Sequence, residues 1–360
     1  MLDQQPLLLF RPQPAEDVYT KRLAAVLRYA LDGVSYEAVS RGEDLASYQN
    51  RRILFAIDLG ASGINLEYYE FLGWLRTHPE GLKGCVAGIL VDGESEYYTK
   101  SVASELVFSA NLAGCAFVGR PLVEGTRTLD NFTTLAQTMD TDPFGAYLES
   151  ARQLVERLRQ EVFPTRNKPH ILALHASQQK TSNTLALWRE AKERLEPACE
   201  INEINLRNGE VADCAGCPYT ACLHFGERGR CFYGGVMVEQ VFPAIKWADA
   251  LMMISPNYND ALAANHTAFI NRLTVLFRQT RFFDKALFSI VVSGYSGSDI
   301  VARQLIDALN MNKSFYLPGH FAMMETAHHP GSALQISGIQ DRIAEFSGHV
   351  IDVLTGPKLA

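Results

Sequence analysis

Residues 170–184 read HILALHASQQKTSNT, and this stretch decides the fold of the C-terminal half. The apolar run Ile171–Leu174 is typical of a buried parallel strand, and it stops abruptly in small and polar residues. A helical pattern starts at Thr184 and continues through Leu187 and Trp188. The stretch therefore predicts a strand, a short polar loop and a helix.

The polar loop of this unit is suited to a phosphate group. The first N–H groups of a helix have no partner inside the helix, and together with the helix dipole they attract anions. The loop adds hydroxyl, amide and amino groups, from Ser177, Lys180, Thr181, Ser182, Asn183 and Thr184. An ordinary helix start with Ser182 or Asn183 as N-cap explains the same residues. The rest of the chain has to decide between the two interpretations.

Size and charge narrow the class of protein. The chain has 360 residues, which suggests two domains that each bury a core. Its formal net charge of −7 argues against nucleic acid or an anionic membrane as the main partner. No apolar run approaches the length of a membrane span, and the run Leu7–Phe10 is too short for a signal peptide. We therefore expect a cytoplasmic protein.

The N-terminal half, residues 1–165, predicts an α/β domain. Residues 1–15 hold three prolines and are interpreted as an irregular arm, after which apolar runs alternate with helical patterns. Strands are expected at 52–59, 85–91 and 116–118, and helices at 17–31, 69–75, 101–112 and 144–159. The loop Gly60–Gly63 would suit phosphate, but the carboxylate of Asp58 precedes it and opposes an anion. We expect no cofactor site in this domain.

The C-terminal half, residues 166–360, follows a polar, proline-bounded linker at 164–169 and shows the alternation more completely. Strands are expected at 171–174, 200–206, 250–254 and 287–292, with a fifth that begins at 314–317. One helix is expected to start at Thr184, and others are expected at 236–247, 262–277, 299–309 and 339–354. This pattern predicts a doubly wound parallel five-stranded sheet. In such sheets ligands bind at the carboxyl ends of the strands.

Three loops are expected at that edge. Besides the polar loop already described, Ser255–Asp260 follows the third strand and Ser293–Gly297 follows the fourth. Both are rich in Ser, Gly or Asn, and they carry Tyr258 and Tyr295, which suit a flat heterocycle. A phosphate-sized loop beside two such loops favours a ligand site over an ordinary helix start.

In these loops the sequence resembles the NAD(P)H-dependent FMN reductase and iron–sulfur flavoprotein group of the flavodoxin-like fold. Ser177–Thr184 is similar to that group's Ser-rich phosphate loop, and Ser255–Tyr258 is similar to its Ser-Pro-x-Tyr loop. The helix after the second loop ends in the pair Asn271–Arg272, and Ser293–Gly297 is similar to the glycine-rich loop after strand four. The resemblance covers roughly residues 168–330. The N-terminal domain looks like a degenerate copy of the same fold.

The resemblance implies FMN as cofactor and NADPH or NADH as co-substrate. The FMN phosphate would lie on Ser177, Lys180, Ser182, Asn183 and Thr184. The isoalloxazine ring would lie along two further sets, Pro256, Asn257, Tyr258 and Asn259, and Ser293, Gly294, Tyr295, Ser296 and Gly297. FMN carries the hydride chemistry in such enzymes, so no catalytic side chain is nominated.

Four cysteines share one loop after the second strand: Cys214, Cys217, Cys222 and Cys231. Four thiolates on one loop suit a [4Fe–4S] cluster or a tetrahedral zinc ion. Free or redox-active thiols explain the same residues, and the spacings are longer than those of the iron–sulfur flavoproteins. Both interpretations stay open.

The sequence therefore leads to two main hypotheses. The first is an FMN-dependent NAD(P)H oxidoreductase that reduces a quinone, flavin or other small acceptor, as a possible homo-oligomer. The second is a non-catalytic electron-transfer or redox-sensing flavoprotein that acts on a protein partner. A zinc-stabilised interaction protein with a vestigial flavin pocket is a third.

Overall fold

The computed structural model of the chain describes residues 5–12, 21–45, 48–177 and 181–356. The chain divides into two compact units, Met1–Val162 and Phe163–Ala360. Within the described residues, none of the helices combines the length and apolarity needed to cross a membrane.

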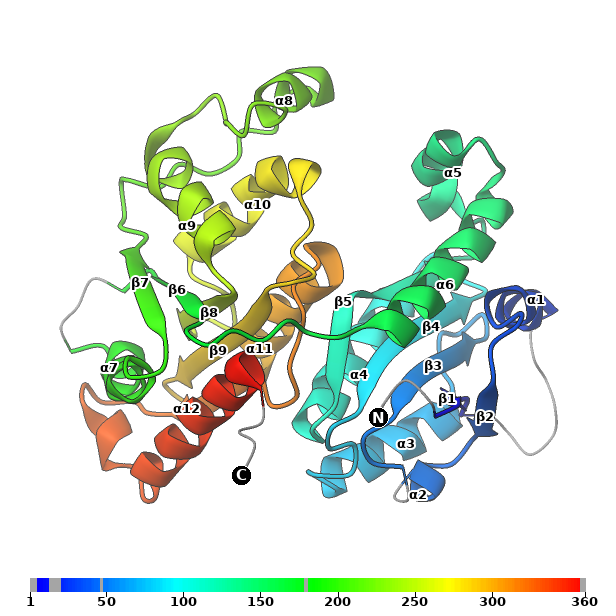
Figure 1. Cartoon of the computed structure of the whole chain (residues 1–360), viewed down its shortest axis with the longest axis horizontal. Helices are drawn as coiled ribbons and strands as arrows, with labels where there is room; N and C mark the ends of the chain where they lie inside the picture. Colours follow the sequence, from blue (N-terminus) through cyan, green and yellow to red (C-terminus); the bar gives the residue numbers. More distant parts are fainter. Residues whose placement is uncertain (1–4, 13–20, 46–47, 178–180, 357–360) are drawn as a thin grey trace. The chain divides into compact units, whose positions relative to one another are not determined.

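The N-terminal unit is a parallel five-stranded sheet with the strand order β2-β1-β3-β4-β5 (Figure 1). Helices α1 and α6 pack on one face, where they share a core with β1, β3, β4 and β5, and α3 and α4 pack on the other face. Its main elements are β1 Leu7–Phe10, α1 Lys21–Ala30, β2 Tyr36–Val39, α2 Gly42–Leu45, β3 Arg52–Leu59, α3 Leu66–Thr77, β4 Val86–Gly93, α4 Thr99–Leu112, β5 Ala116–Gly125, α5 Thr133–Met139 and α6 Pro143–Gln160.

The interpretation of residues 1–15 as an irregular arm is wrong for Leu7–Phe10. These four residues form β1, which is buried throughout and pairs with β2 on one side and β3 on the other. An inner strand of a parallel sheet has apolar neighbours on both faces, so it reads as an unbroken apolar run. Four such residues between prolines are too few to be distinguished from an arm by pattern alone.

The C-terminal unit is a second parallel sheet, with the order β10-β9-β8-β6-β7. Counted along this unit, the order is 2-1-3-4-5, which is that of the flavodoxin-like fold. The predicted fold class is confirmed. The main elements are β6 His170–His175, α7 Asn183–Leu195, β7 Glu200–Asn205, α8 Tyr219–Gly226, α9 Phe242–Trp247, β8 Ala250–Pro256, α10 Ala264–Gln279, β9 Ala286–Ser293, α11 Ser298–Leu305, β10 Ala322–Thr326 and α12 Ile339–Thr355.

Helices α7 and α12 share a buried core with one face of this sheet, and α9, α10 and α11 lie on the other side of it in Figure 1. The fifth strand is not where the sequence predicted it. Within the predicted segment 314–317, Tyr316 makes only an isolated bridge to Ala286, and the strand that pairs with β9 is Ala322–Thr326. The apolar run at 315–317 is buried as a strand would be, so hydrophobicity alone does not separate the two segments.

The N-terminal unit has the same strand order, 2-1-3-4-5, but an ion pair occupies the carboxyl ends of β4 and β5. Asp92 is fully buried, and its carboxylate accepts hydrogen bonds from Nε and Nη2 of Arg22, both at 2.9 Å. Tyr147 donates its hydroxyl to the same carboxylate at 3.1 Å. Arg22 also donates to the carbonyl oxygens of Gly93 and Arg127.

Replacing Arg22 by Ala is expected to destabilise the N-terminal unit by about 2–4 kcal/mol, because it leaves the buried carboxylate of Asp92 without its cation. Burial raises the pKa of Asp92, and the hydrogen bonds and charge of Arg22 limit that rise. Without Arg22 the pKa of Asp92 in the folded state rises further above its unfolded value. The loss of stability should therefore grow as the pH rises from about 4 towards 8.

Urea unfolding of both proteins across this pH range measures the effect. The matched control is Arg152→Ala, which removes an exposed ion pair with Glu149 on α6 and should cost less than about 1 kcal/mol. Equal, pH-independent losses in the two variants would show that the Arg22–Asp92 pair contributes no more than a surface pair.

Candidate functional site

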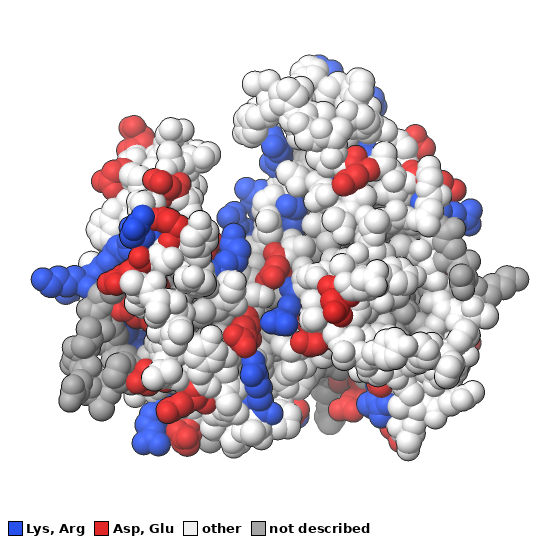
Figure 2. Space-filling model, turned by 180° about the vertical axis from the view of Figure 1, so that it is seen from behind, with Lys and Arg blue, Asp and Glu red and all other residues white. Residues whose placement is uncertain are grey.

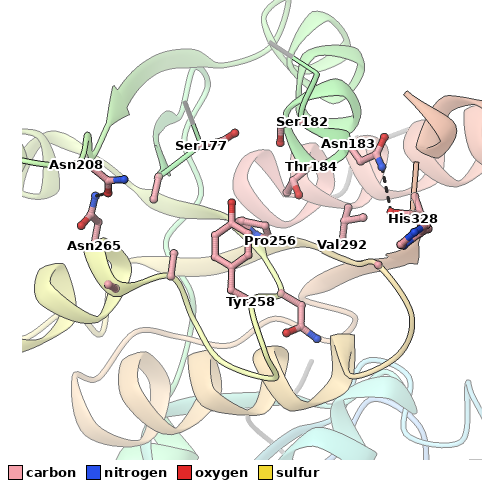
Figure 3. A pocket seen from close by; sticks show the side chains of 16 residues that line it. Ser177, Ser182, Asn183, Thr184, Asn208, Pro256, Tyr258, Asn265, Val292 and His328 are labelled. Atoms are coloured by element: carbon pink, nitrogen blue, oxygen red, sulfur yellow. Dashed lines mark hydrogen bonds between the residues drawn. The ribbon is translucent and has the colours of Figure 1, made fainter. Parts of the chain in front are cut away.

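The carboxyl ends of β6, β8 and β9 surround a cavity of about 790 Å³ (Figure 3). Eight of the residues predicted from the sequence line it: Ser177, Ser182, Asn183, Thr184, Pro256, Asn257, Tyr258 and Gly294. Thr181, Asn259, Ser293, Tyr295, Ser296 and Gly297 belong to the same loops but are not among the lining residues. Lys180 lies outside the described residues. The structure thus brings parts of all three loops together around one cavity.

The first loop offers hydroxyl groups at the start of α7. Ser182 is the N-cap, and its Oγ accepts a hydrogen bond from the N–H of Leu185 at 3.3 Å. Ser177 and Thr184 are only 6% and 2% exposed, and both line the cavity. Neither hydroxyl is hydrogen-bonded to another side chain or backbone group of the described residues. Both residues therefore place a hydroxyl group beside the cavity, which suits an anionic ligand.

The second loop is a tight turn that presents Tyr258. Asn259 and Asp260 have positive φ values of 55° and 58°, a conformation that Asn and Asp adopt more readily than most residues. Tyr258 and Ala261 exchange two backbone hydrogen bonds of 3.2 Å across the turn. The Tyr258 side chain is 54% exposed, and Figure 3 shows its ring within the space that the lining residues surround.

Asn257 joins the second loop to the third. Its Nδ2 donates to Oγ of Ser293 at 2.8 Å and to the carbonyl oxygen of Ser296 at 3.0 Å. Gly297 is required beside it, because a Cβ at that position would lie 2.8 Å from Nδ2 of Asn257 and 2.2 Å from Oδ1 of Asp260. The two loops are therefore held in one fixed arrangement, which suits a rigid, flat ligand.

Several residues of the cavity were missed by the sequence argument: Ala176, Asn208, Ala263, Ala264, Asn265, Val292, Ala327 and His328. Ala176 and Val292 directly precede predicted residues, whereas the other six come from segments that the sequence argument did not assign to the site. Asn265 donates to Oδ1 of Asn208 at 2.9 Å, a pairing between residues far apart in the sequence that no local pattern indicates. His328 is the second residue after β10. Because the sequence argument placed the fifth strand at 314–317, it did not put His328 at the carboxyl edge of the sheet.

The four cysteines lie in a loop that contains the short helix α8. Cys214 is exposed, and Cys217, Cys222 and Cys231 are partly exposed. Across the described part of the chain, no group of three or more His, Cys, Asp or Glu side chains is placed to hold a metal ion. The structure therefore gives no support to the predicted cluster or zinc site. The Cys217 thiol does raise the pKa of Tyr233, with smaller contributions from burial, Cys231 and Cys214.

Both ends of this cysteine loop are held by the Asn271–Arg272 pair of α10. Arg272 is 2% exposed and donates to the carbonyl oxygens of Ala212 at 3.3 Å and Gly234 at 2.8 Å. Asn271 donates to Oδ1 of Asp213 at 2.9 Å. The first turn of α10 carries Ala264 and Asn265, which line the cavity. One helix therefore contacts the cavity at its start and the cysteine loop further along.

A buried histidine supports the second loop from the same helix. His266 is fully buried, and its Nδ1 lies 3.3 Å from Oγ of Ser255, just before Pro256. Burial, with a smaller contribution from His175, lowers the pKa of His266 to about 4. The imidazole is therefore neutral at physiological pH and contributes no charge to the cavity.

The strand order and the three loops define the C-terminal unit as a flavodoxin-like α/β domain with a ligand cavity at its carboxyl edge. Residues 169–329 match the family model of NADPH-dependent FMN reductase. This match makes residues 169–329 similar to that family. Among curated proteins, none matches the chain.

Solved structures similar to the chain include an NAD(P)H:quinone oxidoreductase from Methanothermobacter marburgensis, with 16% identity and a TM-score of 0.38, over 51% of this chain and 96% of that one. An FMN-dependent NADH-azoreductase from Bacillus anthracis in complex with FMN has 12% identity and a TM-score of 0.34, over 51% of this chain and 99% of that one. An apo NADH:FMN oxidoreductase has 16% identity and a TM-score of 0.35, over 53% of this chain and 92% of that one.

Replacing His266 by Gln is expected to reduce the acid sensitivity of the C-terminal unit. The folded-state pKa of about 4 lies below the ordinary histidine pKa of about 6.5, so the imidazole is protonated in the unfolded chain at a higher pH than in the folded one. Stability is therefore lost as the pH falls from about 6.5 to about 4, by roughly 3 kcal/mol for a shift of this size.

Urea midpoints at about pH 7 and pH 4.5 measure this difference, with the exposed His329→Gln as control. The wild type and the control should lose more stability over this range than His266→Gln. An identical acid response in all three would contradict the assignment.

Proposed function

We propose that the C-terminal domain, residues 166–360, binds FMN, and that the protein passes a hydride from NADPH or NADH to a quinone, a flavin or another small acceptor. The observation that carries the proposal is that Ser177, Ser182 and Thr184 line one cavity together with the start of α7 and two loops that Asn257 joins. The family match over residues 169–329 supports the same chemistry.

The residues present fit FMN. The N–H groups of α7 and the hydroxyls of Ser177, Ser182 and Thr184 would hold the phosphate. The second and third loops, Pro256–Asn259 and Ser293–Gly297, would orient the ring, since Asn257 fixes one against the other. FMN supplies the hydride chemistry when it is bound. Tyr258 and Tyr295 are 54% and 78% exposed and offer aromatic surface to the co-substrate or acceptor.

We propose the N-terminal domain, residues 1–165, as a domain without a cofactor site. It has the same strand order, but Arg22 fills the edge beside β4 and β5 with hydrogen bonds to Asp92, Gly93, Gly125 and Arg127. Among the residues that the structure describes, this carboxylate–guanidinium pair takes the place at the ends of β4 and β5 that a phosphate or a ring would need.

The flavin content of the purified protein tests this assignment. Reconstitution with excess FMN, followed by removal of free flavin and absorbance measurement, is expected to give one FMN per chain. A ratio near two would contradict the proposal that the N-terminal domain has no cofactor site.

Loss of the two hydroxyls should weaken FMN binding without unfolding the domain. Ser177→Ala and Thr184→Val each remove one hydrogen bond to a charged phosphate, so each is expected to raise the Kd for FMN about tenfold. Flavin fluorescence quenching measures it. The control is Thr181→Ala, because Thr181 is exposed and does not line the cavity, and its Kd should equal that of the wild type. Equal Kd values in all three variants would contradict the phosphate position.

A second candidate function is a redox-sensing or electron-transfer flavoprotein that acts on a protein partner through the cysteine loop. What favours it is α10, which lines the cavity at Asn265 and holds both ends of the cysteine loop through Arg272.

Steady oxidation of NADPH or NADH with an added quinone supports the enzyme, whereas turnover that stops after reduction of the bound flavin supports the sensor. Iron and zinc analysis of anaerobically purified protein tests the cluster and zinc alternatives.

A further inference from the structure

His328 is held against the start of α7 by the side chain of Asn183. The Nδ2 of Asn183 donates to the carbonyl oxygens of Ala327 at 3.0 Å and His329 at 2.8 Å, which are the residues on either side of His328. The Oδ1 of Asn183 accepts from the N–H of Ala333 at 3.3 Å. The segment after β10 is therefore fixed to the helix terminus that offers its N–H groups to the cavity.

The imidazole of His328 also contacts the third loop. Its ring centroid lies 4.7 Å from that of Tyr295, and a Cβ on Gly294 would lie 3.6 Å from its Nδ1. His328 lines the cavity, and Figure 3 shows it below Asn183 and next to Val292. The side chain therefore lies between the first loop and the third.

Charge distinguishes His328 from the other lining residues. Of the described residues that line the cavity, none is Lys, Arg, Asp or Glu, and His328 is the only one that can become a cation. The titratable groups in ring contact with it are Tyr295 of the third loop and His329 of its own segment, and α7 presents the uncharged Asn183. Histidine is the side chain whose charge changes between about pH 5 and 8.

We propose that His328 in its protonated form pairs with the phosphate of FMN, so that cofactor affinity depends on pH. This role rests on the proposed function of the cavity. A cation near a phosphate that is otherwise held by uncharged hydroxyl and N–H donors adds a charge-assisted interaction. The second and third loops would hold the ring of the flavin, and His328 contacts the third of these through Tyr295, so its effect on ring binding has to be measured separately.

The test compares FMN with riboflavin, which lacks the phosphate. Kd values for both flavins are measured on the flavin-free full chain by fluorescence quenching at about pH 6 and pH 8. His328→Gln should weaken FMN binding about fivefold at the lower pH and leave riboflavin binding unchanged, which also shows that the variant is folded. His328→Arg should keep tight FMN binding at both pH values, because its charge is permanent.

The matched control is His329→Gln, since His329 is exposed and does not line the cavity. It should bind both flavins as the wild type does. FMN binding by His328→Gln equal to that of the wild type at the lower pH would overturn the role of His328, and so would an equal loss for FMN and riboflavin. A wild-type chain that binds neither flavin would overturn the proposed function itself, and this outcome is distinct from the other two.

Discussion

Parallel pairing is the constraint on which the site depends. Strands β6, β8 and β9 all run in one direction, so each of them ends at the same edge of the sheet, and the loops that follow must meet there. Residues as far apart in the sequence as Ala176 and His328 thereby line a single cavity. Side-chain amides then fix the loops relative to one another. Asn257 joins the second loop to the third, and Asn183 joins the first loop to the segment after β10.

The parts of the fold that follow from local patterns could be predicted from the sequence. Apolar runs predicted β3, β6 and β9, and their alternation with helices predicted the α/β class. Leu7–Phe10 is as long as the apolar run in β6, but it lies between prolines in an N-terminal segment, and the buried segment 315–317 resembled the true fifth strand. Hydrophobicity reports burial, and it does not report which partner a segment pairs with.

The same distinction applies to the site. Ser177, Asn257 and Tyr258 could be placed beside the cavity because turn chemistry directly after a strand is visible locally. The position of His328 beside the cavity could not, because it depends on where β10 ends. The Arg22–Asp92 pair joins residues 70 positions apart, and nothing near Arg22 in the sequence marks it as more than a helix residue. The two units therefore have the same strand order but differ at the carboxyl edge of the sheet. In the N-terminal unit an ion pair lies there, and in the C-terminal unit a cavity does.

Arg272 binds the carbonyl oxygens of residues 212 and 234, so it holds the two ends of the cysteine loop in place. The entropic cost of closing a loop grows only slowly with its length. Residues between 212 and 234 can therefore be inserted, deleted or replaced, the cysteines included, while the two ends stay fixed to α10. Such changes would leave Asn208, which precedes the loop and lines the cavity, in its position.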